Sequence, residues 1–210
     1  MKYATALSPA SIVNAWTCQT PGLLGWTNFL PYEIPAWSNW NGVNLNYQSF
    51  PHSLNNPNYQ NIPGYSQGDT FTHELGHVLG MLHTFRNGVN GCVYGDDIPD
   101  TPPEATPAFG RSCNMNPHRK TCPGTPGIDP VWNIMDYSDD YCASEFTPDQ
   151  VDMMRYYLET YRENLAIHEP LRCVASGSRV LRCLGQFVYL NALSQAMLLM
   201  VDLPHKVDGV

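Results

Sequence analysis

The alternation of apolar and polar positions divides the first half of the chain into an extended region followed by a helix. Residues 42–47, Gly-Val-Asn-Leu-Asn-Tyr, place apolar and polar side chains in turn, and this period of two predicts a half-buried strand. From about residue 66 to 79 the period becomes helical, with apolar side chains at spacings of four. Gly80 follows, and glycine adopts the left-handed conformation in which helices commonly end.

The second half of the chain carries one clear helix start. Thr147-Pro148-Asp149-Gln150 combines a capping threonine, a proline in the first turn and a glutamine that can complete a capping box. Between the two helices, residues 86–132 are dense in Gly, Pro, Cys and Asp and have almost no apolar periodicity. Such a long irregular stretch within a compact domain is expected only where disulfides or bound metal hold it. Residues 168–210 carry a weak helical pattern and no chemical motif.

Composition narrows the class of protein. The length of 210 residues suits one sizeable core, and the net charge of −8 excludes the basic surface that nucleic acid requires. No uncharged apolar run reaches the roughly 18 residues that cross a bilayer. Seven cysteines favour an oxidising, secreted setting, although no signal peptide is visible, because polar residues and Pro9 interrupt the stretch after Met1.

Residues 72–83, Thr-His-Glu-Leu-Gly-His-Val-Leu-Gly-Met-Leu-His, carry the candidate chemistry. His73 and His77 are four apart, so on a helix they share one side and can chelate a zinc ion at roughly 2.0–2.1 Å. Glu74 lies about 100° round the helix from His73, where a base can take a proton from zinc-bound water. The glycine after the helix lets His83 return as a third ligand, which leaves a fourth position open for catalysis.

The alternative is that three histidines near one helix are merely surface or core side chains. A glycine and a third histidine at the extended spacing make that alternative much weaker. A structural zinc site would need a fourth protein ligand near His83, and no cysteine or histidine lies between positions 84 and 91.

A second motif, Asn-Ile-Met-Asp-Tyr at residues 133–137, is similar to the Met-turn of metzincins. Met135 would pack beneath the three imidazoles as an apolar floor and not as a ligand; taken alone, it would be ordinary core packing. Tyr137 could reach the metal-bound oxygen and stabilise the oxyanion that forms there. Its alternative role is a buried aromatic side chain with a satisfied hydroxyl group.

Together with residues 95–102, Gly-Asp-Asp-Ile-Pro-Asp-Thr-Pro, these motifs resemble the pappalysin family of metzincin zinc metalloproteases, from about residue 11 to 164. The resemblance implies an α/β fold: a metzincin-like twisted mixed sheet with an active-site helix, then a loop-rich C-terminal subdomain with the Met-turn and a terminal helix. It implies a zinc-dependent metalloendopeptidase that hydrolyses internal peptide bonds of extracellular proteins. The strand at 42–49 would be the edge that aligns the polypeptide substrate.

The same resemblance assigns the individual residues. It implies His73, His77 and His83 as zinc ligands, Glu74 as general base and acid, and Tyr137 as transition-state stabiliser. It also implies disulfides joining Cys92 to Cys122 and Cys113 to Cys142, whereas the sequence alone allows three pairings of these four cysteines and leaves Cys18, Cys173 and Cys183 outside the pattern. Calcium is implied at the acidic segment 95–104, with Asp96 and Thr101 as ligands; a solvated acidic loop is the alternative.

The domain boundaries follow from where the resemblance ends. We expect a catalytic domain at residues 1–167 and an atypical tail at 168–210. Because the family has a further strand and helix upstream, we expect the catalytic domain to be N-terminally incomplete, in a truncated or misjoined chain. The alternatives to an enzyme are a catalytically defective truncated relative and a zinc-containing binding protein. The expected partner is a polypeptide substrate, and neither nucleic acid nor a membrane is expected to bind. The protein is expected to be a monomer.

Overall fold

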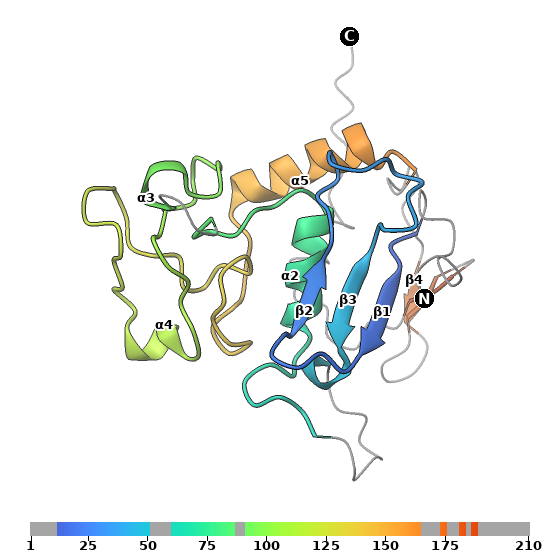
Figure 1. Cartoon of the computed structure of the whole chain (residues 1–210), viewed down its shortest axis with the longest axis horizontal. Coiled ribbons are helices and arrows are strands. Elements are labelled where there is room, and N and C mark those ends of the chain that lie inside the picture. Colours follow the sequence, from blue (N-terminus) through green and yellow to red (C-terminus); the bar gives the residue numbers. More distant parts are fainter. Residues whose placement is uncertain are drawn as a thin grey trace.

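The computed structural model describes residues 12–50, 60–86 and 91–164, and the backbone of three further strands (Figure 1). These strands are β4 (Cys173–Ala175), β5 (Leu181–Cys183) and β6 (Gln186–Val188), which form an antiparallel sheet in that order. The weak pattern at 168–210 indicated a helix, and this indication is wrong at these three strands. Short apolar runs occur in helices and in strands alike, so the pattern alone could not tell the two apart. The rest of that expected tail, like residues 1–11, lies outside the described part of the chain.

The first sheet has three strands in the order β1–β3–β2. Strand β1 (Ala15–Cys18) runs parallel to β3 (Val43–Asn46), and β2 (Gly25–Thr27) runs antiparallel to it. Val43 and Leu45 are fully buried, and a 3-10 turn, η1 (Tyr47–Ser49), ends the strand. The sheet is thus mixed, and with the helices it confirms the predicted α/β class.

The prediction that the strand at 42–49 is an edge strand is wrong. Strand β3 is the central strand and pairs on both sides, whereas β2 pairs only with β3 among the described strands. The period of two showed a strand but could not show its neighbours, because pairing depends on segments far apart in the sequence. The edge available to a second chain near the helix belongs to β2.

Helix α2 (Asp69–Val78) packs against this sheet, where Val78 and Phe71 contact the core formed by Val43 and Leu45. It begins after Gly68, later than the pattern predicted, and its C-cap is Leu79. Gly80 has the expected left-handed conformation, with φ of +93°. A Cβ atom there would also lie 2.3 Å from the ring of Tyr157, so this turn requires glycine for its backbone and for its packing.

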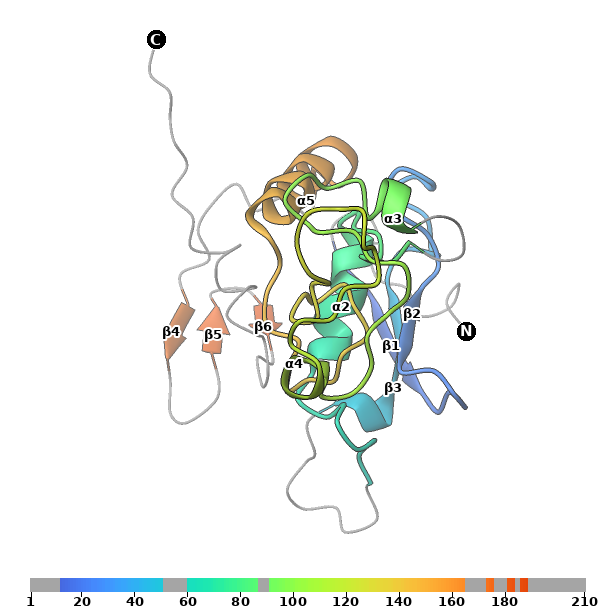
Figure 2. The same ribbon diagram turned by 90° about the vertical axis from the view of Figure 1, so that its left-hand side faces the viewer.

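The loop-rich half lies on the other side of α2 from β3 and β1 (Figure 1) and faces the viewer in Figure 2. It contains α3 (Gly91–Tyr94) and α4 (Ser112–Met115). Helix α5 (Pro148–Tyr161) ends it and begins with the predicted capping box: Gln150 N donates to Thr147 Oγ1 at 3.2 Å, and Thr147 N donates to Gln150 Oε1 at 2.9 Å. The hydrophobic core of the loop-rich half consists of Met81, Ile134, Met135, Phe146 and Met154. The segment after α2 and the Met-turn therefore share one core with α5.

Disulfides and buried ion pairs hold this irregular half. Cys92 is joined to Cys122 and Cys113 to Cys142, which is the pairing that the family resemblance implies. Arg119 contributes a third tie through ion pairs with Glu104 and Asp129, which are 15 and 10 positions away. The long irregular stretch is thus held by the two disulfides and by the ion pairs of Arg119, as expected for such a stretch within a compact domain.

We expect the Cys92→Ala/Cys122→Ala double variant to lose roughly 3–4 kcal/mol of unfolding free energy, because the crosslink closes a loop with a sequence separation of 30 residues. Urea unfolding under non-reducing conditions measures this loss. Cys18→Ala is the matched control, since Cys18 is exposed and unpaired in the described part of the chain. A double variant as stable as the control would contradict the crosslink argument.

Candidate active site

Three imidazoles converge on one point at the C-terminal half of α2 and the turn that follows. Nε2 of His83 lies 3.2 Å from Nε2 of His73 and 3.0 Å from Nε2 of His77. The other ring nitrogens of the two helical histidines face backbone carbonyls: Nδ1 of His73 is 2.7 Å from the oxygen of Ile134, and Nδ1 of His77 is 2.6 Å from that of Met81. These carbonyls hold the proton on Nδ1 and turn the lone pair of Nε2 toward the common point.

The cluster fits a zinc ion. Tetrahedral ligands at roughly 2.0–2.1 Å stand roughly 3.3 Å apart, close to the separations here. Burial first, then the neighbouring histidines, lowers the pKa of His73 to about 3 and that of His83 to about 2, so the rings are neutral, as metal ligands must be. In the described part of the chain, no other group of three or more His, Cys, Asp or Glu side chains converges in this way.

Glu74 stands beside the histidines without joining their cluster. Its side chain is buried, and Oε2 accepts a hydrogen bond of 2.9 Å from Oγ1 of Thr27 on the edge strand β2. Burial raises the pKa of Glu74 to about 7, against the lowering effect of the Thr27 hydrogen bond. A carboxyl group with a pKa in this range can both take and return a proton at neutral pH.

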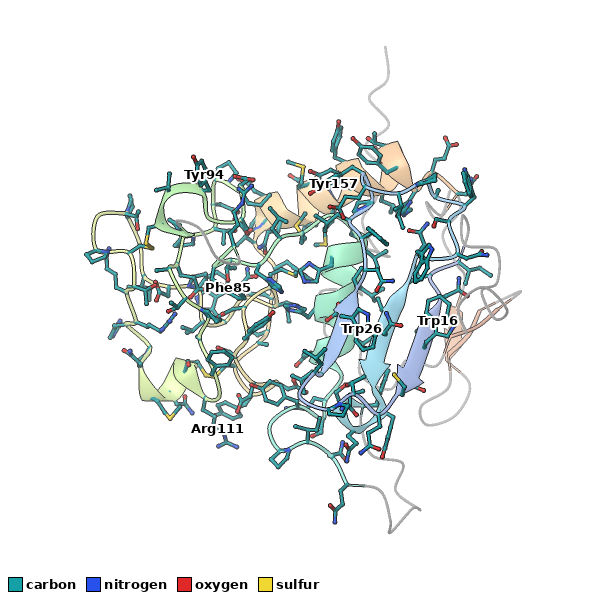
Figure 3. All side chains as sticks on the ribbon, in the orientation of Figure 1. Trp16, Trp26, Phe85, Tyr94, Arg111 and Tyr157 are labelled. Atoms are coloured by element: carbon teal, nitrogen blue, oxygen red, sulfur yellow. A yellow bond between two sulfur atoms is a disulfide. The ribbon has the colours of Figure 1, made fainter. Side chains whose placement is uncertain are left out.

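An aromatic group joins the third histidine to Tyr137. Phe85 stacks on His83 with ring centroids 4.7 Å apart and an interplanar angle of 9°, and it meets Tyr137 edge-on, also at 4.7 Å. Tyr137 lies 4.9 Å from His83. Figure 3 shows Phe85 on the loop-rich side of α2 and Trp26 on the side of the sheet. Burial, then the charges of Glu74 and Asp136, raises the pKa of Tyr137, which keeps its phenol protonated as a donor.

Met135 explains the glycine within the histidine motif. Met135 is fully buried, and a Cβ atom on Gly76 would lie 2.5 Å from its sulfur and 3.3 Å from Cε1 of Phe146. Gly76 has ordinary helical dihedrals, so its role is to allow this close approach. The Met-turn can therefore pack directly against the helix that carries His73 and His77.

A cleft of about 400 Å³ runs along the histidines. One wall is the segment from Gly22 to Thr27, which includes β2, and the opposite wall includes Ile134, Tyr137 and Phe109. Asp69 and Asp140 place two carboxyl groups in this cleft, and a second hollow of about 360 Å³ continues past His77 toward Phe29, Leu82 and Arg86. All three histidines line the cleft, and His77 and His83 also line the second hollow.

The two candidate calcium ligands are engaged in hydrogen bonds. Asp96 is buried and accepts from Nε2 of Gln150 at 2.8 Å and from the backbone of Ile98 at 3.0 Å. Oγ1 of Thr101 lies 3.3 Å from Oγ1 of Thr147. Both side chains therefore anchor the start of α5 to the acidic segment.

A helix with two of three converging histidines, a glycine turn before the third and a methionine turn beneath them define the metzincin class of fold. The family model described as pregnancy-associated plasma protein-A (Peptidase_M43) matches residues 39–159. The chain therefore belongs to this family, the pappalysins.

Curated relatives and solved structures agree with this membership. An extracellular metalloprotease of Verticillium alfalfae is 46% identical over 108 residues, which are 49% of this chain and 36% of that protein. One from Neurospora crassa is 37% identical over 142 residues, 66% of this chain and 45% of that protein. Mirolysin in complex with compound 9 is 31% identical, with a TM-score of 0.64 over 78% of this chain and 59% of that one. The match spans less than half the length of these curated relatives.

The mature mirolysin of Tannerella forsythia in complex with a cleaved peptide gives a similar result, with 31% identity and a TM-score of 0.61. Both solved structures share the arrangement of sheet and helices with this chain over 78% of its length.

Sequence reasoning missed several residues of this site. Thr27 binds Glu74 from 47 positions away, and nothing in its local pattern marks it. Asp69 begins the helix and looks like an ordinary first-turn acid, yet it lines the cleft. Phe85 follows the motif by two residues and could have been singled out as an aromatic residue close to a ligand.

We expect Gly76→Ala to destabilise the chain by about 1–3 kcal/mol through overpacking against Met135, although alanine is about 1 kcal/mol better than glycine in a helix interior. Zinc affinity should fall as well, because the displaced methionine presses on the imidazoles. Thermal melts and zinc titration measure both effects. Gly124→Ala is the control, since a Cβ atom there meets nothing within 4 Å; a stabilised Gly76→Ala variant would contradict the packing argument.

Proposed function

We propose that this chain carries the catalytic unit of a zinc-dependent metalloendopeptidase that hydrolyses internal peptide bonds of extracellular proteins. The observation that supports it most is the meeting of three neutral imidazole nitrogens with the Glu74 carboxyl group in one groove. We assign the catalytic unit to residues 1–167, and the family match at 39–159 falls within this range.

The residues of this chain have distinct parts in the proposed reaction. Zinc held by His73, His77 and His83 would supply a Lewis acid for the scissile carbonyl and lower the pKa of the attacking water. Glu74 takes the proton of that water and returns it to the leaving amine. The phenol of Tyr137 donates a hydrogen bond to the oxygen that gains negative charge.

The edge strand β2 aligns the substrate in this proposal. An extended peptide can add to the free edge of a sheet through its main chain, so that its side chains alternate between the groove and solvent. Residues 22–27 line the groove and end at Thr27, the residue that binds Glu74. A peptide on this edge would therefore pass directly over the histidines.

Secretion is part of the proposal. It is supported by two disulfides and by the extracellular relatives. No helix in the described residues is long and apolar enough to span a bilayer. Calcium at Asp96 and Thr101 is proposed on the resemblance alone, and calcium-dependent melting of the zinc-loaded chain would test it. We also propose that the enzyme acts as a monomer, which sedimentation would check.

Glu74→Gln is the decisive test. The variant should retain one zinc per chain, because Glu74 is not a ligand, and should lose detectable hydrolysis of a quenched fluorescent peptide. Atomic absorption and the peptide assay are run on the same sample. Zinc lost together with activity would show that Glu74 has another role, and a wild-type chain that binds zinc without hydrolysis would favour the binding-protein alternative.

Tyr137→Phe tests the oxyanion donor. We expect kcat to fall by about 10²–10³ while KM changes little, because the phenol contributes only in the transition state. Tyr141→Phe is the matched control, since it removes the same hydroxyl group from an exposed ring. An unchanged kcat in Tyr137→Phe would leave that side chain a purely structural role.

A further inference from the structure

Two buried carboxyl groups of the loop-rich half, those of Glu104 and Asp129, contact one guanidinium, and a third, that of Asp136, interacts with the same charge. Glu104, Asp129 and Asp136 are 0%, 1% and 3% exposed. Nη1 of Arg119 lies 2.7 Å from Oε2 of Glu104 and 2.8 Å from Oδ2 of Asp129. A single positive charge thus faces three acidic groups that are shielded from water. Burying charges without enough partners is strongly unfavourable, so one of these groups should be neutral.

The hydrogen bonds indicate which group holds the extra proton. Oδ1 of Asp136 accepts from the backbone of Ala108 at 3.0 Å. No donor in the described part of the chain reaches Oδ2 of Asp136, although this atom is buried. Burial raises the pKa of Asp136, and a side-chain hydrogen bond with Glu104 is among the interactions that lower it. Two carboxyl groups can form such a bond only through a shared proton. A proton on Glu104 supplies the missing donor.

This pair ties together the two segments that form the floor and rim of the active site. Oε1 of Glu104 accepts from Oγ1 of Thr84, the residue after His83. The backbone of Thr84 donates to the carbonyl of Met135 at 3.4 Å. Asp136 is the single residue between Met135 and Tyr137. A bond between Glu104 and Asp136 therefore fixes the segment of Tyr137 relative to the third histidine.

We propose that Glu104 and Asp136 share one proton, and that this pair is a positioning element which holds Tyr137 at the histidines and loosens when the proton is lost. The proposal rests on the proposed function, because the place of Tyr137 matters only if its phenol acts in the reaction. Glu104 contacts neither the groove nor the histidines directly, so it is a positioning residue and not a catalytic one.

The electrostatics give the pH range of this device. Burial, followed by the charge of Asp136, raises the pKa of Glu104 from 4.5 to about 8, and burial raises that of Asp136 to about 6. The other charged groups facing the pair are Arg119, which lowers the pKa of Glu104, and Asp129, which raises it. Because the folded state holds a proton that the unfolded chain releases, the stability from this pair is complete below about pH 4.5 and is lost as the pH rises through about 8.

The Glu104→Gln variant distinguishes the effect of the shared proton from the effect of side-chain packing, because glutamine has nearly the same shape as glutamic acid and does not titrate. The amide donates permanently to Asp136, and its oxygen still accepts from Thr84 or Arg119. In the zinc-loaded wild type we expect kcat to fall by about tenfold for each pH unit above about 8, with KM unchanged. The variant should keep its kcat through this range, or lose it at least one unit later. Glu159→Gln, an exposed change of the same charge on α5, is the control and should follow the wild type.

Two measurements without turnover accompany the kinetics. The wild-type melting temperature should fall between pH 6 and 9 more steeply than that of Glu104→Gln. Infrared difference spectra of wild type against Glu104→Gln at pH 7 should contain the C=O band of one protonated carboxyl group, and this band should disappear by pH 10. Glu104→Ala lacks both donor and acceptor, so it should melt lower than the glutamine variant and have a lower kcat at every pH.

The proposal is overturned if Glu104→Gln shows the wild-type alkaline limb in both kcat and melting temperature, or if the difference spectrum lacks a protonated carboxyl band. It is also overturned if alanine and glutamine at position 104 behave alike, since packing alone would then explain the site. A chain that hydrolyses no peptide at any pH would instead contradict the proposed function. In that case the infrared band and the melting curves still decide whether the proton is shared.

Discussion

The convergence of three imidazoles, with Nε2 of His83 lying 3.2 Å from Nε2 of His73 and 3.0 Å from that of His77, is the constraint on which the rest of this structure depends. Lone pairs facing one another repel unless a cation lies among them, so the surrounding protein must hold the rings in place. The carbonyls of Ile134 and Met81 do so by fixing the Nδ1 protons of His73 and His77. Those carbonyls belong to the Met-turn and to the turn after α2, which makes both segments part of the ligand geometry.

The close approach of the Met-turn to α2 follows from that requirement. Ile134 can reach His73 because Met135 packs against a helix position without a side chain, Gly76. The turn that returns His83 needs a second glycine, whose missing Cβ atom makes room for the ring of Tyr157 on α5. Two glycines in one motif thus serve different contacts, one with the methionine and one with the terminal helix.

Low solvent access gives the acidic residues around this centre their chemistry. Burial raises the pKa values of Glu74, Glu104 and Asp136, but the three groups have different neighbours. Glu74 has a threonine hydroxyl and an open groove, which suits a group that exchanges protons with a substrate. Glu104 has Thr84 and Arg119 as its partners, which suits a fixed tie between loops. The same desolvation therefore acts on a carboxyl group that faces the cleft, Glu74, and on one that joins two loops, Glu104.

Local sequence patterns determined much of this protein. The spacing of His73, His77 and His83 predicted that their side chains converge, because helical periodicity and one glycine turn fix where they project. The capping box of α5 was equally local, and the four-cysteine pairing came from the family resemblance. These features depend on residues a few positions apart or on an inherited motif.

Only the tertiary structure decided which strand is the edge, how Thr27 meets Glu74 and how Glu104 meets Thr84. The alternation of apolar and polar residues in β3 would be the same in a central strand and in an edge strand. Its central position follows from its pairing with β1 and β2. Thr27 and Glu74 are 47 positions apart, and Glu104 and Thr84 are 20 apart. No periodicity connects such residues, because their contact depends on how the loops pack and on which carboxyl groups lose their water.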